Sequence, residues 1–314
     1  MTTAPIAETP IAKLGAPRPR RPEWLKIRAG GGANFIAVKD VVREQKLHTV
    51  CEEARCPNIG ECWGHGTATF MILGDTCTRG CRYCAVHKGL PTELDLEEPA
   101  RLADAVRQMG LSYVVITSVD RDDLADGGAA VFAASIREIR DRSPGTTVEV
   151  LIPDFQGNPE ALRAVLEATP DVLNHNVETV PRLYRRARGG GVYAITLDLL
   201  ERARQSVPSL VTKTGMMLGL GEETPEILAV MRDLVERGVD ILTLGQYLRP
   251  SEWHLPVARF VHPDEFAELA RWGESMGFAH VEAGPLVRSS YRADRQLLKS
   301  RLAQGARPLA ARAG

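Results

Sequence analysis

The stretch that decides the fold is Cys77-Thr-Arg-Gly-Cys81-Arg-Tyr-Cys84, which comes shortly after the apolar segment 68–73. A short apolar run of this kind is typical of a buried strand. Parallel α/β folds gather their chemistry in the loops that follow the carboxyl ends of strands. Closely spaced cysteine thiolates are ligands of soft metal centres and of iron–sulfur clusters. The stretch therefore predicts a strand followed by a metal-binding loop.

Outward from this loop, apolar segments alternate with amphipathic ones as far as about residue 260. We expect strands at 68–73, 113–119, 147–152, 172–176, 211–218 and 241–244, and helices at 101–109, 129–140, 159–168, 197–204 and 225–237. Strands separated by helices form parallel sheets with right-handed crossovers. Six such units are fewer than the eight that close a barrel. The sequence thus predicts an α/β fold, a partial (β/α)6 TIM-like barrel that is open on one side.

The remaining segments are expected to be additions to this barrel. Residues 1–22, rich in Ala, Pro and Thr, are predicted to form a flexible N-terminal arm. Residues 23–66 are predicted to be an N-terminal extension, 67–262 the partial barrel, and 263–314 a C-terminal extension.

The composition is that of an ordinary globular protein, with 44% apolar and 25% charged residues. A net charge of −1 gives no basic field for a nucleic-acid partner. No stretch approaches the ~20 apolar residues of a membrane helix. Cysteines in a chain without an apolar leader indicate a reducing compartment, so we expect a cytoplasmic location.

All six cysteines lie in two triplets, the one quoted above and a second made of Cys51, Cys56 and Cys62. Three cysteines on a 4Fe–4S cube leave one iron for another ligand, so the pattern predicts two clusters that each have one special corner. Disulfides are an alternative, but disulfide scaffolds are typically small and secreted. Structural zinc is another, with His65 and His87 as available fourth ligands.

The spacing of Cys77, Cys81 and Cys84, with an aromatic residue before the last cysteine, resembles the cluster motif of radical S-adenosylmethionine (SAM) enzymes. The resemblance implies that these cysteines hold three irons of a 4Fe–4S cluster whose fourth iron binds SAM. Reductive cleavage of SAM then supplies a radical that attacks inert C–H bonds. This chemistry places the three cysteines among the expected catalytic residues.

Two further strings closely resemble motifs of the lipoyl synthase family: Cys51-Glu-Glu-Ala-Arg-Cys56-Pro-Asn-Ile-Gly-Glu-Cys62-Trp and Arg288-Ser289-Ser290-Tyr291. The resemblance extends over about residues 22–300. It implies that Cys51, Cys56, Cys62 and Ser290 hold an auxiliary 4Fe–4S cluster that donates sulfur, with Ser290 also taking part in catalysis. From the residues alone, Ser289 or Ser290 is equally compatible with capping a helix that begins near Tyr291.

Five polar residues are predicted to contact SAM or substrate because they lie in or just after expected strands: Ser118, Arg121, Asn176, Glu178 and Lys213. A solvated acidic loop, a turn or an exposed lysine would explain the same residues without a ligand. The chain departs from the family in the segment 185–196, where Gly189–Gly191 predicts a flexible hinge.

The resemblance implies a sulfurtransferase, a lipoyl synthase, that inserts two sulfur atoms at carbons 6 and 8 of a protein-bound octanoyl-lysine. Its expected partners are octanoylated lipoyl domains of 2-oxoacid dehydrogenase E2 subunits, the glycine cleavage H protein, and a one-electron reductant such as flavodoxin or ferredoxin. We expect neither a nucleic-acid nor a membrane partner. A biotin-synthase-like or methylthiotransferase-like enzyme, or a non-catalytic metal-binding or electron-transfer protein, remains the alternative.

Overall fold

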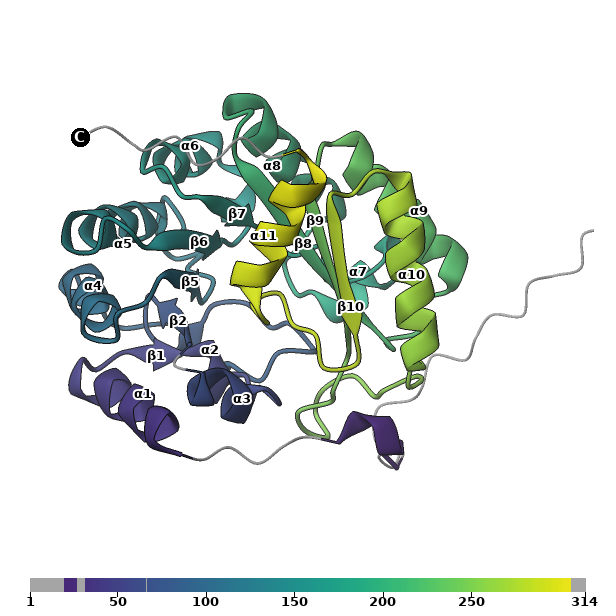
Figure 1. The fold of residues 1–314 in the computed structure, drawn as a ribbon, viewed down its shortest axis with the longest axis horizontal. Helices are drawn as coiled ribbons and strands as arrows, with labels where there is room; N and C mark the ends of the chain where they lie inside the picture. Colours follow the sequence, from purple (N-terminus) through teal and green to yellow (C-terminus); the bar gives the residue numbers. More distant parts are fainter. Residues whose placement is uncertain (1–19, 27–31, 66, 306–314) are drawn as a thin grey trace, which may run out of the picture.

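The computed structural model describes residues 20–26, 32–65 and 67–305. Its centre is a curved eight-stranded sheet (Figure 1). Each strand is hydrogen-bonded to the next in the order β1 (His48–Thr49), β2 (Thr69–Ile72), β5 (Tyr113–Ser118), β6 (Thr147–Leu151), β7 (Val172–Asn174), β8 (Val211–Leu218), β9 (Ile241–Gln246) and β10 (His280–Gly284). Every pairing is parallel except that of β1 with β2. Within the described residues β10 does not pair with β1, so the barrel is partial.

Helices cover the outer face of this sheet (Figure 1). They are α4 (Glu98–Gln108), α5 (Ala129–Arg142), α6 (Pro159–Glu167), α7 (Pro181–Ala187), α8 (Tyr193–Ser206), α9 (Thr224–Glu236) and α10 (Pro263–Met276). The N-terminal extension contributes η1 (Glu23–Leu25), α1 (Ala33–Glu44), α2 (Val50–Glu53) and α3 (Ile59–Gly64). Three short elements lie in loops, β3 (Thr76–Cys77), β4 (His87–Lys88) and η2 (Phe155–Gly157), and α11 (Ala293–Ala303) ends the described chain.

The structure confirms the predicted partial barrel and its six strands to within a few residues. It adds a seventh parallel strand, β10, which comes from the segment predicted to be a C-terminal extension. The segment boundaries themselves stay a prediction. The predicted N-terminal arm lies outside the described residues apart from residues 20–22.

Local sequence explains how each crossover is built. The β-branched run Val114, Val115 and Ile116 in β5 is buried, as expected of a parallel strand that is covered on both faces. Asn158 begins α6 by accepting hydrogen bonds from the first amides of the helix, and Glu223 and Glu226 form a capping box at α9. Because helices begin at fixed caps, the loops before them hold their residues at the carboxyl ends of the strands.

Helix α11 closes the opposite end of the barrel. Its Leu297 packs against Val172, Val211 and Ile241, which are the first residues of β7, β8 and β9. Figure 1 shows α11 crossing in front of β8 and β9. The barrel therefore has an apolar floor at the amino ends of these strands. None of the described helices is both long and apolar enough to cross a membrane.

Candidate active site

One cavity of about 950 Å³ occupies the barrel, and both cysteine triplets line it. All six cysteines are free thiols, and only Cys51 is fully buried. Within each triplet the thiols are near enough to raise one another's pKa. The structure thus brings together the seven predicted cluster ligands, because Ser290 also lines this cavity.

The first triplet lies in the loop between β3 and β4. Burial, and then the charges of neighbouring groups, raise the pKa of Cys81 to about 11 and that of Cys84 to about 12. Backbone amides of Arg79 and Val86 donate hydrogen bonds to Cys77 and Cys84. Buried thiols of this kind become thiolates only when a cation compensates them, so the donor set fits an iron–sulfur cluster. Among the described residues, no three or more His, Cys, Asp or Glu side chains are placed around a single metal ion, whereas a 4Fe–4S cluster takes its ligands on different irons.

A buried arginine inside the cysteine loop fixes the conformation of that loop. Arg79 donates hydrogen bonds of 2.7 and 2.8 Å to Asp122, and of 2.6 and 2.8 Å to Asp154. Burial alone would lower the pKa of Arg79, but the hydrogen bonds to Asp122 and Asp154 outweigh it and raise the pKa. The acidic loop after β5 therefore clamps the cysteine loop through Arg79. Sequence reasoning missed this residue.

Three of the predicted SAM contacts line the cavity: Ser118, Asn176 and Glu178. The Ser118 Oγ and Asn176 Oδ1 atoms are buried without a hydrogen-bond partner. Glu178 accepts hydrogen bonds from Asn176 Nδ2, at 3.2 Å, and from the Tyr83 hydroxyl. Buried polar atoms without partners are rare in proteins, so these atoms fit a polar ligand in the cavity.

Two glycines lie where a side chain would collide with groups at the site. A Cβ at Gly215 in β8 would lie 2.8 Å from Asn176 Oδ1. A Cβ at Gly189 would lie 3.0 Å from the carbonyl carbon of Gly80 in the cysteine loop. The predicted hinge at Gly189–Gly191 thus lies directly against the cysteine loop, and its glycines permit close backbone approach.

Arg188 is a second cavity residue that the sequence did not single out. It is buried, donates to the Asn176 carbonyl at 2.7 Å, and lies 3.3 Å from His175 Nε2. Burial, followed by the charge of Arg188, lowers the pKa of His175 to about 3, so that the ring is neutral. Arg188 therefore places a fixed positive charge at the wall that also carries Glu178.

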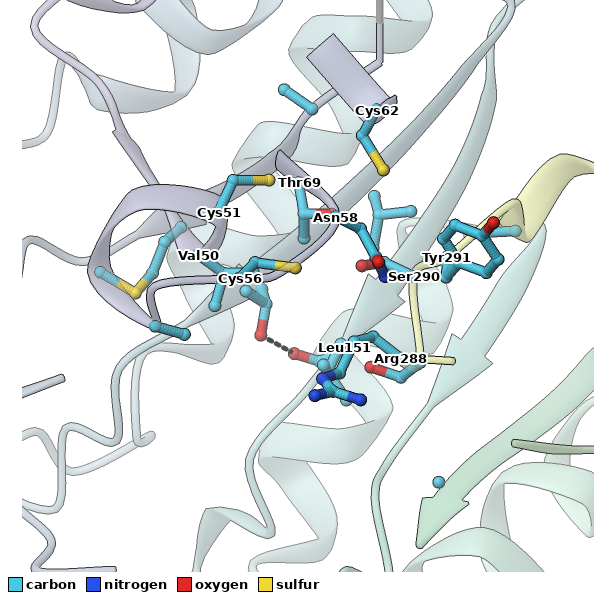
Figure 2. A pocket seen from close by; sticks show the side chains of 18 of the residues that line it. Val50, Cys51, Cys56, Asn58, Cys62, Thr69, Leu151, Arg288, Ser290 and Tyr291 are labelled. Atoms are coloured by element: carbon cyan, nitrogen blue, oxygen red, sulfur yellow. Dashed lines mark hydrogen bonds between the residues drawn. The ribbon is translucent and has the colours of Figure 1, made fainter. Parts of the chain in front are cut away.

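The second triplet comes from α2, α3 and the turn between them. Figure 2 shows the side chains of Cys51, Cys56 and Cys62 directed into one space, with Ser290 on its other side. Burial, and then the neighbouring thiols, raise the pKa of Cys62 to about 12. The amide of Asn58 donates a hydrogen bond to Cys56. This donor set fits a second cluster for the same reason as the first.

The segment that carries Ser290 is joined to the second triplet by side chains. Asn58 Nδ2 donates to the Leu286 carbonyl at 2.7 Å. The Tyr291 hydroxyl donates to Glu61 at 3.0 Å, and Arg292 donates to the same carboxylate at 2.6 Å. The N-cap of α11 is Arg292, without a side-chain cap, so neither Ser289 nor Ser290 caps this helix.

The structure separates the other two predicted contacts from the cavity. Arg121 is buried and donates to Asp123 at 2.8 Å and to two backbone carbonyls. Lys213 is fully buried beneath the cavity and donates to Glu149 at 2.9 Å. Neither is among the residues that line the cavity. Both carry a basic group that is already paired with a carboxylate of the chain itself.

Comparison with known proteins agrees with this geometry. The family model of the radical SAM superfamily matches residues 71–234, and the N-terminal domain of lipoyl synthase matches residues 7–56. Among solved structures, methylornithine synthase covers 86% of this chain at 13% identity with a TM-score of 0.51. Streptococcus suis SuiB bound to S-adenosylmethionine covers 69% at 10% identity, also with a TM-score of 0.51. The fold and the cysteine loop define a radical SAM enzyme.

Curated relatives identify the family within that class. The lipoyl synthase of Rubrobacter xylanophilus is 59% identical over 276 residues, which are 88% of this chain and 86% of the relative. That of Thioalkalivibrio sulfidiphilus is 56% identical over 94% of this chain and 92% of the relative. The chain belongs to the lipoyl synthase family.

Proposed function

We propose that this chain forms lipoyl groups by inserting two sulfur atoms, at carbons 6 and 8, into an octanoyl-lysine of a carrier protein. The observation that carries the proposal is that both cysteine triplets and Ser290 line one cavity. A sulfur donor and a radical source would then meet the same substrate chain. The family membership supports the same activity.

Each triplet would hold one 4Fe–4S cluster. Cys77, Cys81 and Cys84 would hold the cluster that binds SAM, and Ser118, Asn176 and Glu178 offer polar atoms for the rest of that molecule. Cys51, Cys56, Cys62 and Ser290 would hold the auxiliary cluster. When bound, these groups would supply a radical that can remove hydrogen atoms from the octanoyl chain and the sulfur atoms that the octanoyl chain then acquires.

The protein's own residues would bind and orient the substrate. Apolar side chains from several elements line the cavity, among them Val41, Met71, Val115 and Met217. They suit an octanoyl chain, whose methylene groups gain free energy on leaving water. Arg79 and Tyr83 would fix the first triplet and Glu178 in place. Tyr291 and Arg292 would keep Ser290 beside the second triplet.

The reaction also requires partners outside this chain. We propose octanoylated lipoyl domains, of E2 subunits or of the H protein, as substrates, and flavodoxin or ferredoxin as the source of single electrons. The free thiols of the site suit a reducing compartment, so we propose that the reaction takes place in the cytoplasm.

The test is anaerobic. The reconstituted protein is mixed with SAM, a reductant and a peptide carrying octanoyl-lysine, and the mass of the peptide is measured by mass spectrometry. We expect a gain of two sulfur atoms together with 5′-deoxyadenosine. Cys77→Ala should abolish deoxyadenosine formation, whereas Cys56→Ala should retain it and lose sulfur insertion. Lipoyl product from Cys56→Ala would contradict the assignment of the sulfur donor.

A further inference from the structure

An exposed tryptophan lies against two basic side chains, one inside the cysteine loop and one in β4 directly after it. The Trp253 ring has the Lys88 ammonium 2.9 Å from its centroid and the Arg82 guanidinium carbon at 4.4 Å. The tryptophan is 45% exposed. Arg186 lies close to Arg82. Burial, and then the charge of Arg82, lower the pKa of Arg186. We refer to Arg82, Lys88, Arg186 and Trp253 as the basic–aromatic patch.

Two residues of the patch, Arg82 and Lys88, carry positive charge against the Trp253 ring. Within the described part of the chain, neither Arg82 nor Lys88 forms an ion pair with a carboxylate. Because both basic groups lie against the same ring, their positive charges are close to each other. Like charges held together cost free energy, and an outside anion would relieve that cost. The whole chain has a net charge of −1, so the patch is a local feature.

Short connections join the patch to the ligands of the first cluster. His254, next to Trp253, has its Nε2 atom 2.7 Å from the Cys84 carbonyl oxygen. The Leu255 amide donates to the Arg82 carbonyl at 2.9 Å. Lys88 of β4 is paired in register with Cys77 of β3. A molecule seated on the patch would thus be a few covalent bonds and one hydrogen bond from the cluster ligands.

We propose that the basic–aromatic patch is the docking surface for a small acidic one-electron carrier protein, which reduces the cluster held by Cys77, Cys81 and Cys84. The carrier loses one electron and the cluster gains it. Complementary charge accelerates such encounters, and electron-transfer interfaces are small, as this patch is. An octanoylated domain must instead face the cavity, and of the four patch residues Lys88 alone lines it. The proposal rests on the proposed function only in that the first triplet holds a cluster.

The test measures electron delivery without the octanoyl substrate. Reduced flavodoxin and SAM are mixed with the reconstituted protein, and bleaching of the cluster and 5′-deoxyadenosine formation are followed. The variant R82E/K88E should be reduced at least about tenfold more slowly at low salt, because two attractive charges become repulsive. Its affinity for oxidised flavodoxin, measured by calorimetry, should fall in parallel. Because Lys88 also lines the cavity, the comparison with dithionite uses R82E alone. Reduction of R82E by dithionite, which needs no docking, should be unchanged, whereas its reduction by flavodoxin should still be slower.

The matched control reverses two charges elsewhere. Arg137 on α5 and Arg232 on α9 are exposed, so R137E/R232E changes the net charge equally and should leave the flavodoxin rate unchanged. If R82E also slows reduction by dithionite, R82Q replaces it, and we expect a slower flavodoxin rate with less dependence on salt than in the wild type.

Two outcomes would overturn the proposal. One is an unchanged flavodoxin rate and affinity in R82E/K88E. The other is a defect that appears only with an octanoylated domain, which would assign the patch to the substrate. A protein that cleaves SAM normally but transfers no sulfur would contradict the proposed function and leave the docking surface intact.

Discussion

The hydroxyl of Tyr291 donates a 3.0 Å hydrogen bond to the carboxylate of Glu61, which lies 230 residues earlier in the chain. Arg292 donates to the same oxygen atom at 2.6 Å. Glu61 directly precedes Cys62, and Tyr291 directly follows Ser290. The contact therefore sets the distance between a cysteine and the serine on the opposite wall of the proposed second cluster site.

Removing the Tyr291 hydroxyl should loosen that wall. We expect Tyr291→Phe to lower the free energy of unfolding by about 1 kcal/mol and to speed the loss of iron from the auxiliary site. Anaerobic iron analysis over time checks this. Tyr193→Phe is the control, because Tyr193 donates a 2.7 Å hydrogen bond to Asp233 away from the clusters. Equal rates of iron loss in both variants would contradict a role for Tyr291 in cluster retention.

The identity of the oxygen donor at Ser290 should decide how readily the second cluster gives up sulfur. A hydroxyl oxygen is a harder and poorer ligand for iron than a thiolate. We expect Ser290→Ala to lower the iron content, and Ser290→Cys to retain the cluster but reduce the yield of sulfur-containing peptide by about tenfold or more. Iron content and product mass are read on the same sample. Unchanged values in Ser290→Ala would exclude Ser290 as a ligand.

The packing of Gly189 against the cysteine loop predicts that even one methyl group is harmful. The added Cβ of Gly189→Ala would press on the Gly80 backbone at 3.0 Å. Overpacking of this kind typically costs about 1–3 kcal/mol. We expect the variant to hold less of the first cluster, measured as iron bound and SAM cleaved. Gly145→Ala is the control, because no atom lies within 4 Å of its Cβ. A fully active Gly189→Ala would favour a flexible hinge.

The salt bridge between Asp154 and Arg79 should make stability depend on pH. Burial would raise the pKa of Asp154, but the hydrogen bonds from Arg79 outweigh it and lower the pKa from 3.8 to about 2. At a pH above the pKa that Asp154 has in the unfolded chain, the carboxylate thus adds about 2 kcal/mol to the free energy of unfolding. This contribution is lost as the pH falls through the pKa of the folded state, about 2. Urea unfolding of the cluster-free chain should show wild type and Asp154→Asn converging between about pH 5 and pH 2.

The control for this pH dependence is the exposed Asp141 on α5. Asp141→Asn should run parallel to wild type over the same pH range. A constant gap between wild type and Asp154→Asn down to pH 2 would show that folding does not lower the pKa of Asp154.

The barrel strands were predictable because parallel strands that are covered on both faces are nearly continuous apolar runs. β10 was not, since among the described strands it pairs with β9 alone and its last three residues, Glu282 to Gly284, are only partly buried. The spacing of the cysteines predicted two triplets, and the structure places both at one cavity. The alternation of Lys213 with apolar residues indicates an inward side chain, but it does not reveal its partner, Glu149 of another strand.

At the site itself, prediction from the sequence was limited by pairs of residues that lie far apart in the chain. Arg79 depends on Asp122 and Asp154, which are 43 and 75 residues away, and no local pattern signals such partners. The three glycines of the segment 185–196 suggested flexibility, because glycine has the same signature whether a backbone must bend or must approach another closely. Whether a glycine serves for bending or for close approach depends on what packs against it in the folded chain.

Because Cys62 and Ser290 are far apart in the sequence, the proposed ligands of the auxiliary cluster are synthesised at different times. During synthesis from the N-terminus, the three cysteines of the second triplet leave the ribosome long before Ser290 exists. The cysteine loop has its contacts earlier in the chain, from Asp122 and Asp154 to His254 and Leu255, so it can be complete before Ser290 is made. A chain that ends shortly before Ser290 would then hold the whole first triplet and its contacts, but would lack one proposed ligand of the auxiliary cluster. Loading of the auxiliary cluster would act as a checkpoint for full-length product.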